Sequence, residues 1–174
     1  LGNVEAIYRT QYAVEDANKV LSENGKEALV YFDSSNSDGF QVDQDGNWSA
    51  TAANNYMTTN LSQFNESNNN MIELIICNND GMAEGAISAL NDKGYNLGTA
   101  ECTTIPVFGV DATDAAKQLI ADKKMTGTIK QDAQGMADCI AFLTSNAASG
   151  KTLMDATDNY IISDKVSNKI YIPY

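Results

Sequence analysis

The chain has 174 residues, which is the length of one ordinary domain and is enough to bury a hydrophobic core. Its net charge of -12 disfavours binding to nucleic acid or to an anionic membrane surface, because like charges repel and no run of basic residues compensates. The absence of histidine removes the usual general base and the commonest zinc ligand, so an enzyme is disfavoured, and the three cysteines are too far apart for a zinc motif or a dense disulfide framework.

Helical and strand patterns alternate in the first half of the chain. Apolar residues recur at helical spacing before Gly25, which predicts an amphipathic helix with the stripe Ala13, Ala17, Val20 and Leu21. The run ALVYF at residues 28–32 predicts a strand. After a polar loop, a second helical stripe precedes a second strand, MIELIIC, at residues 71–77. This second stripe consists of Ala53, Met57, Leu61 and Phe64.

The alternation continues in the second half. Asp80 is placed to cap a helix that Gly94 ends. Strands are predicted at residues 105–110 and 126–130, and helices at residues 111–124 and 132–150. Residues 158–174 are predicted to form a hairpin or a linking segment. This order predicts an α/β fold, with a mostly parallel open sheet and helices on both faces.

Polar side chains follow three of the predicted strands: residues 78–80, Asp111, and Gln131 with Asp132. Ligands of open α/β sheets bind outside the carboxyl ends of the strands, so this shared edge predicts a ligand site. The alternative for Asp80, Asp111 and Asp132 is that each caps a helix, and for each residue alone this interpretation is favoured. Asn79 precedes the expected cap and therefore has no evident backbone role.

Two segments carry a family resemblance: IELIICNNDGMAEGAISALNDKG and IPVFGVDATDAAKQLIADKKMTGTIKQDAQGMA. They resemble the periplasmic galactose/glucose-binding proteins of bacterial sugar uptake, which are type 1 periplasmic binding proteins with two α/β lobes that close on one hexose. The resemblance implies that residues 1–174 form a single domain similar to the carboxyl-side lobe. It also implies that the strand which opens this lobe is missing, and that residues 158–174 form a hinge or terminal-strand segment.

The resemblance also implies a sugar site. In it, Arg9 would donate to hydroxyls or to the ring oxygen, Asp111 would accept from two hydroxyls, and Asn79 would do both. Trp48, the only tryptophan, would pack its ring against the apolar face of the pyranose. Without the resemblance, Trp48 could equally be a core residue, and Arg9 would be read as a solvated helix residue. Three further positions depart from the enteric family members but keep hydrogen-bonding capacity: Asn3, Glu5 and Gln131.

Glu73 matches the glutamate that completes the calcium site of the family. The loop that supplies the other ligands belongs to an upstream segment, so we predict no metal ion for this chain. No residue pattern calls for a cofactor either.

Two classes of function remain. The leading hypothesis is a receptor outside the bacterial cytoplasm, periplasmic or a cell-surface lipoprotein, that binds a hexose such as galactose or glucose. Its expected partners are an ABC permease, a chemoreceptor as in some family members, and the amino-side lobe of the same protein. The alternative is the sugar-sensing core of a lactose-repressor-type regulator, which calls for a basic helix-turn-helix that the sequence does not contain. An α/β enzyme that uses carboxylates ranks last.

Overall fold

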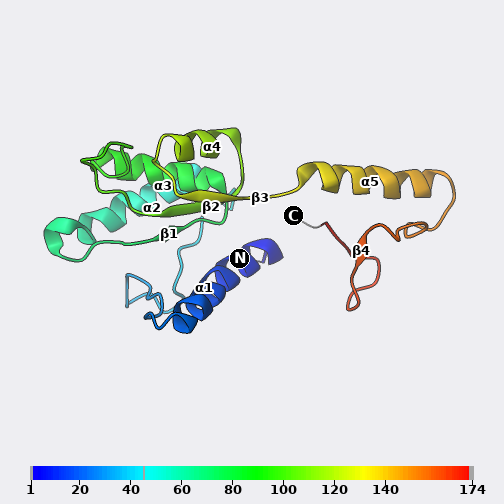
Figure 1. The fold of residues 1–174 in the computed structure, drawn as a ribbon, viewed down its shortest axis with the longest axis horizontal. Coiled ribbons are helices and arrows are strands. Elements are labelled where there is room, and N and C mark those ends of the chain that lie inside the picture. The colour runs from blue at the N-terminus through cyan, green and yellow to red at the C-terminus, as the bar shows by residue number, and fades with distance from the viewer. Residues whose placement is uncertain (1, 45, 173–174) are drawn as a thin grey trace. The chain divides into compact units, whose positions relative to one another are not determined.

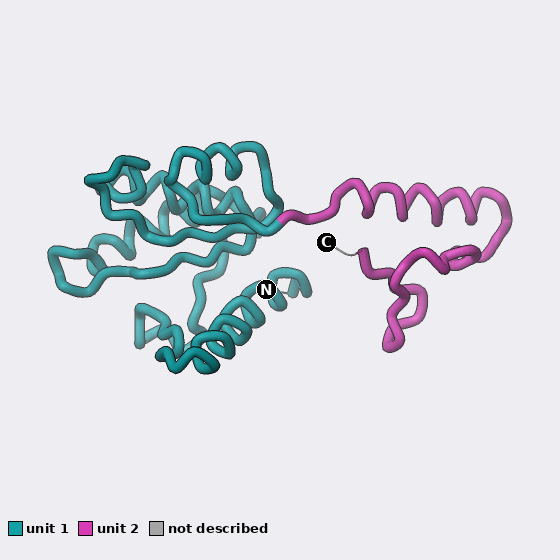
Figure 2. Tube along the Cα trace, in the orientation of Figure 1, with its two compact units in different colours: residues 1–129 teal, residues 130–174 magenta. Residues whose placement is uncertain are grey.

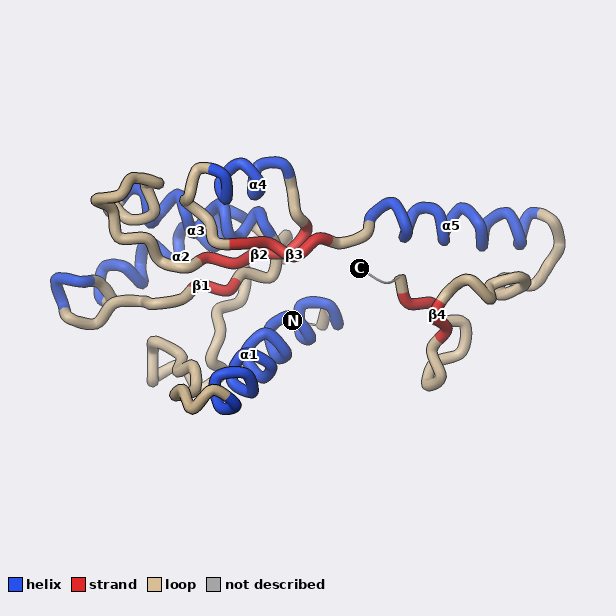
Figure 3. Tube along the Cα trace, in the orientation of Figure 1, coloured by secondary structure: helices blue, strands red, loops and turns tan. Residues whose placement is uncertain are grey.

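A three-stranded sheet organises the first part of the computed structural model, which describes residues 2–44 and 46–172 (Figures 1 and 3). The strand order is β1–β2–β3, and the strands are β1 (Ile75–Ile76), β2 (Val107–Asp111) and β3 (Gly127–Lys130). β1 and β2 are parallel, with Ile75 opposite Val107. The chain therefore has the parallel α/β arrangement that its alternating pattern predicts.

Four helices accompany the sheet in this part of the chain: α1 (Val4–Glu23), α2 (Ala50–Gln63), α3 (Asp80–Asp92) and α4 (Asp114–Ala121). A short 3-10 helix, η1 (Glu66–Asn68), follows α2. In Figure 1, α2, α3 and α4 gather on one side of the strands, and α1 lies on the other side. No helix in the described part of the chain combines the length and the apolar character needed to cross a bilayer.

The hydrophobic core lies where α3 meets the sheet and α2. Ile87 and Leu90 of α3 are at most 2% exposed, and Val107 of β2 is 0% exposed. Met57 and Leu61 join this cluster from the stripe predicted for α2. The apolar stripe predicted for α2 is therefore confirmed as core-facing.

The chain divides into two compact units, Leu1–Ile129 and Lys130–Tyr174 (Figure 2). The second unit contains α5 (Ala133–Ala148), β4 (Ile161–Ile162) and β5 (Ile170–Tyr171). β4 and β5 pair in antiparallel fashion, so the tail forms a hairpin, which is one of the two outcomes its sequence predicts. A single lobe over residues 1–174, with a hinge segment at 158–174, stays a prediction.

Two predicted strands differ in the structure. Residues 28–32 are irregular, with Val30 89% exposed and the Leu29 N–H donating to the Asn18 side chain at 2.7 Å. A short β-type run forms a strand only beside a partner, and no described strand pairs with this one. The strand expected at 71–77 shortens to Ile75–Ile76, the part that pairs with β2.

Candidate functional site

The first half of α1 carries three of the predicted site residues. Asn3 caps this helix, since its side-chain oxygen accepts a hydrogen bond from the Ala6 N–H at 3.1 Å. Glu5 lies in the first turn, and its Oε2 is 3.7 Å from Nη2 of Arg9 one turn later. The Glu5 side chain is 74% exposed, so this ion pair contributes little stability. Other contacts therefore set the orientation of the Arg9 guanidinium.

Two such contacts hold the Arg9 guanidinium at the end of β1. Its Nη1 donates to the Asn78 carbonyl at 2.7 Å. Its central carbon lies 5.6 Å from the centre of the Trp48 ring, which is within cation–π distance. The Asn78 side chain strengthens the connection to α1 by donating to Oγ1 of Thr10 at 2.9 Å. The structure thus brings Arg9 and Trp48 together.

Asn79 joins the same group through both ends of its amide. Its Oδ1 accepts from the Met82 N–H at 2.8 Å and caps α3, and its Nδ2 donates to the Trp48 carbonyl at 3.3 Å. Two expectations are corrected here: Asn79 does have a backbone role, and the cap of α3 is not Asp80. The error of one residue arises because Asn and Asp are both preferred at N-caps and are neighbours in this sequence.

Asp80 connects three segments beneath this edge. It is fully buried, at 0% exposure. Its Oδ2 accepts from the Thr113 N–H at 2.8 Å, and its Oδ1 accepts from the Thr128 hydroxyl at 2.6 Å. The start of α3 is thereby joined to the residues after β2 and to β3. Burial of a carboxylate is tolerated here because both of its oxygens accept hydrogen bonds.

The capping interpretation holds for Asp132 and fails for Asp111. Asp132 accepts from the Gly135 N–H at 3.1 Å and caps α5. At α4 the cap is Thr113, whose hydroxyl oxygen accepts from the Ala116 N–H at 3.1 Å. Asp111 is instead the last residue of β2, two positions before that cap.

Asp111 sits in a constrained turn at the edge of the sheet. Asp111 and Ala112 have φ angles of 120° and 55°, which are uncommon for residues with a side chain. Such conformations cost on the order of 1–3 kcal/mol each and persist where surrounding contacts enforce them, often at binding sites. Asp111 ends β2 and Asn79 comes after the neighbouring parallel strand β1, so both residues lie on the carboxyl side of the sheet.

Gln131 and Glu73 are the remaining residues that the resemblance singles out. Gln131 follows β3 directly, is partly buried and belongs to the second compact unit, so its place in the site stays a prediction. Glu73 is exposed in the segment before β1, so its carboxylate stays hydrated without a metal ion. The described residues contain no group of three or more His, Cys, Asp or Glu side chains that could hold a metal ion.

Cys77 follows β1 and adds no thiolate chemistry to this edge. Its burial raises the thiol pKa to about 12, and the neighbouring Asp80 carboxylate raises it as well. A thiol that stays protonated at neutral pH is a poor nucleophile. All three cysteines are free thiols, as their spacing predicts.

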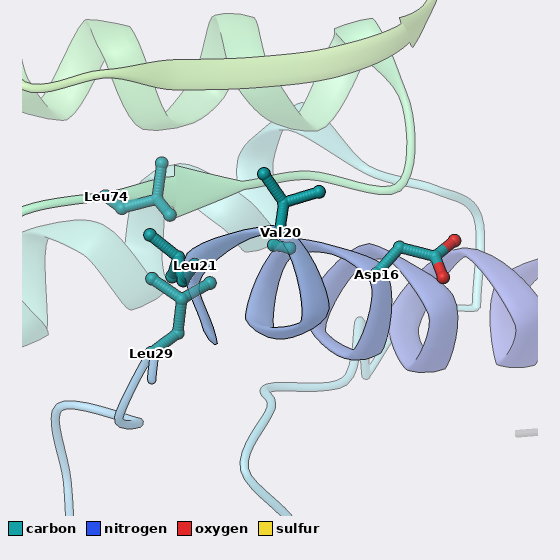
Figure 4. Close-up of a pocket in the computed structure, with 6 residues that line it drawn as sticks. Asp16, Val20, Leu21, Leu29 and Leu74 are labelled. Carbon is teal, nitrogen blue, oxygen red and sulfur yellow. The ribbon is translucent and has the colours of Figure 1, made fainter. Parts of the chain in front are cut away.

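An apolar groove of about 490 Å³ lies between the second half of α1 and the segment before β1 (Figure 4). Its lining residues are Asp16, Ala17, Val20, Leu21, Leu29 and Leu74. The lining is almost wholly apolar, and in Figure 4 the carboxylate of Asp16 points away from the leucine side chains. A ligand that needs hydrogen bonds does not fit such a lining. The polar edge around Arg9 and Asn79 is therefore the candidate site.

Sequence reasoning missed the supporting residues of this edge. The Asn-Asn-Asp run predicts a ligand residue and a cap, whereas the structure gives Asn78, Asn79 and Asp80 three different tasks. A run of three polar residues directly after a buried strand is a signal for Asn78. Thr128 has no local signal, because its partner Asp80 lies 48 residues earlier.

The chain is similar to periplasmic binding proteins. A family profile described as periplasmic binding protein domain matches residues 6–152. The D-galactose/methyl-galactoside binding periplasmic protein MglB of Haemophilus influenzae is 32% identical over 177 residues, which cover 99% of this chain and 44% of that protein. A protein of Rhizobium meliloti, provisionally named rhizopine-binding protein, is 32% identical over 132 residues, which cover 76% of this chain and 35% of that protein.

Among solved structures, an ABC transporter solute-binding protein from Burkholderia multivorans aligns with a TM-score of 0.48 at 23% identity. The alignment covers 62% of this chain and 35% of that one. The chain thus spans less than half the length of the curated relatives it matches.

Proposed function

Because the chain belongs to the periplasmic binding protein domain family, we propose that it is one lobe of a non-catalytic receptor that binds a monosaccharide outside the cytoplasm. The proposed ligand is a hexose such as galactose or glucose, delivered to an ABC permease in the membrane. The galactoside named for the Haemophilus influenzae relative supports this ligand class. The Rhizobium meliloti relative carries another ligand in its name at the same identity, so binding measurements have to identify the sugar.

The observation that carries this proposal is the meeting of Arg9, Trp48 and Asn79 at the carboxyl edge of the parallel sheet, with Asp111 at the carboxyl end of the neighbouring strand β2. This edge is where open α/β sheets bind their ligands. The helix N-terminus that Asn79 caps also favours ligands with oxygen acceptors there.

The side chains at this edge match the chemistry of a pyranose. A guanidinium has five N–H donors, and the bond from Arg9 to the Asn78 carbonyl uses one of them. A carboxylate such as that of Asp111 accepts from two neighbouring hydroxyls, and such charge-assisted bonds are the strong ones. The flat ring of Trp48 suits the C–H face of a sugar. In the proposed receptor, the amino-side lobe of the same protein supplies the facing contacts, and closure of the two lobes encloses the sugar.

Isothermal titration calorimetry of the complete protein that the gene encodes tests this proposal, with D-glucose, D-galactose and D-ribose as ligands. We expect tight binding of one hexose. Asp111→Ala should weaken that binding roughly 10- to 100-fold, because a hydrogen bond to a charged group contributes about 1.5–3 kcal/mol.

Asp114→Ala is the matched control for this measurement. It removes the same charge three residues later, from a side chain that is 102% exposed and pairs with Lys117 on α4. Its affinity should equal that of the wild type. Absence of binding to all three sugars, or equal losses in the two variants, would contradict the proposal.

A further inference from the structure

We propose that Asp80 and Thr128 form a positioning pair that fixes the backbone of Asp111 and Ala112 in the conformation that ligand binding requires. Neither residue is a proposed sugar contact; they act through Asp111. The inference rests on the proposed function for its effect on sugar affinity, whereas its effect on the Asp111 backbone can be measured without any ligand.

The hydrogen bonds around the turn form a continuous chain. The Thr128 hydroxyl donates to Oδ1 of Asp80 at 2.6 Å, and its Oγ1 accepts from the Ala112 N–H at 3.1 Å. The other carboxylate oxygen of Asp80 accepts from the Thr113 N–H at 2.8 Å. The two backbone N–H groups that directly follow Asp111 are therefore both held by this pair.

The turn needs such support because its backbone is unfavourable without it. Asp111 and Ala112 have φ angles of 120° and 55°, and neither residue is glycine. Conformations of this kind persist only where neighbouring groups enforce them. Here Asp80 is 0% exposed and both of its oxygens already have fixed donors, and Thr128 is partly buried.

Gly109 makes this arrangement possible. It lies in β2 two residues before Asp111, and a Cβ at this position would collide with Oδ1 of Asp80. The absence of a side chain lets the carboxylate lie directly against β2. The carboxylate can then reach past the strand to the N–H of Thr113.

The test compares two substitutions at Thr128 in the complete protein. Thr128→Val keeps the shape but removes the hydroxyl, so the Ala112 N–H and the Asp80 carboxylate each lose a partner. Thr128→Ser keeps the hydroxyl. We expect Thr128→Val to weaken binding of the cognate hexose by about tenfold or more, and Thr128→Ser to bind within about threefold of wild type.

Thr126→Val is the matched control, because it makes the same change two residues earlier in the chain. Its hydroxyl oxygen accepts from the Val107 N–H at 3.1 Å, so this variant also loses a hydrogen bond from β2, at the amino end of that strand. A purely structural role predicts that both valine variants lower the melting temperature and leave affinity unchanged. A positioning role predicts that only Thr128→Val loses affinity.

A second readout separates this inference from the proposed function. The φ angles of Asp111 and Ala112 in the ligand-free protein, measured from NMR scalar couplings or a crystal structure, should change in Thr128→Val and stay as in wild type in Thr128→Ser and Thr126→Val. If the wild type binds no sugar, the proposed function fails, and these angles alone decide the positioning role.

Unchanged angles in Thr128→Val would overturn the inference. So would a Thr128→Val variant that binds the hexose as tightly as Thr126→Val does. If Thr128→Val does not fold, Asp80→Asn takes its place in both measurements, because the amide keeps the size of the carboxylate but offers one acceptor oxygen to two donors.

Discussion

Asn79 has a structural role in α3 and, in the proposed receptor, would also contact the sugar. Its oxygen caps α3 and its nitrogen reaches the Trp48 carbonyl, so its orientation is fixed before any sugar arrives. A pre-oriented polar group loses less conformational freedom on binding. The cap is therefore part of the proposed recognition as well as part of the helix.

Substitutions at Asn79 should separate these two tasks. Asn79→Ala removes the cap and should lower the free energy of unfolding by about 0.5–2 kcal/mol. Asn79→Ser keeps a good capping oxygen, so its free energy of unfolding should lie within a few tenths of a kcal/mol of the wild-type value. Because the amide group is removed, its affinity for the hexose should fall roughly 3- to 10-fold. Urea unfolding and calorimetry measure the two effects. A serine variant with wild-type affinity would remove Asn79 from the site.

Cys77 gives a prediction about alkaline pH. The thiol pKa is about 12 in the folded chain, because of burial and of Asp80, and about 8.5 in an unfolded chain. The folded state therefore disfavours the thiolate. The contribution of this thiol to the free energy of unfolding is fully present below about pH 8.5 and declines as the pH rises toward 12.

Urea unfolding between about pH 8.5 and about pH 10.5 should therefore show a shallower loss of stability in Cys77→Ala than in wild type. The expected slope from this thiol is at most about 1.4 kcal/mol per pH unit. Identical slopes in the two proteins would mean that Cys77 is more hydrated than its burial indicates.

At the scale of elements, the contact between α2 and α3 positions the indole of the site. A Cβ at Gly85 in α3 would collide with the carbonyl oxygen of Ala50 at the start of α2. The Asn54 side chain also donates to the Gly85 carbonyl at 3.1 Å. Since Trp48 lies two residues before Ala50, this close approach helps to place its ring beside Arg9.

Gly85→Ala should therefore destabilise the protein by roughly 1–3 kcal/mol, because the collision involves backbone and the helices must move apart. Gly81→Ala is the matched control in the same helix. Its Cβ would find its nearest neighbour at 3.7 Å, so it should be neutral or stabilising by up to about 1 kcal/mol. Thermal and urea unfolding of both variants check the difference, and equal stabilities would contradict the close packing.

The sequence predicts best those elements whose apolar residues recur at a regular spacing because one face of the element is buried. The stripe of α2 is correct, because the apolar face of this helix packs into the core that it shares with α3. The expected strand at residues 28–32 is wrong, because its apolar run specifies a strand only where a neighbour supplies hydrogen bonds. The predicted start of α3 is wrong by one residue, because Asn and Asp are equally good caps and the pattern does not choose between Asn79 and Asp80.

At the scale of the whole molecule, the proposed function assigns to this chain one side of a sugar site. It spans 44% of the length of the Haemophilus influenzae relative. The proposed contacts of the first compact unit lie at one sheet edge, and a hexose resting there would keep its opposite face in water. Hydroxyls that remain hydrated contribute little to affinity, because a protein contact then only replaces a water contact.

The isolated chain of residues 1–174 should therefore bind the cognate hexose roughly 100-fold more weakly than the complete protein, or not measurably. Calorimetric titration of both proteins under the same conditions tests this expectation. An isolated chain with low-micromolar affinity would mean that the second lobe is not needed for binding.

The cation–π contact between Arg9 and Trp48 has an optical consequence. The chain contains a single tryptophan, and its ring lies beside the Arg9 guanidinium. Indole emission responds to nearby charge and to water, and no second indole in this chain adds background. A sugar that covers the ring and accepts hydrogen bonds from the guanidinium would change both the hydration of the indole and the charge beside it. If the proposed site is correct, the emission of Trp48 would therefore report sugar binding without an attached dye.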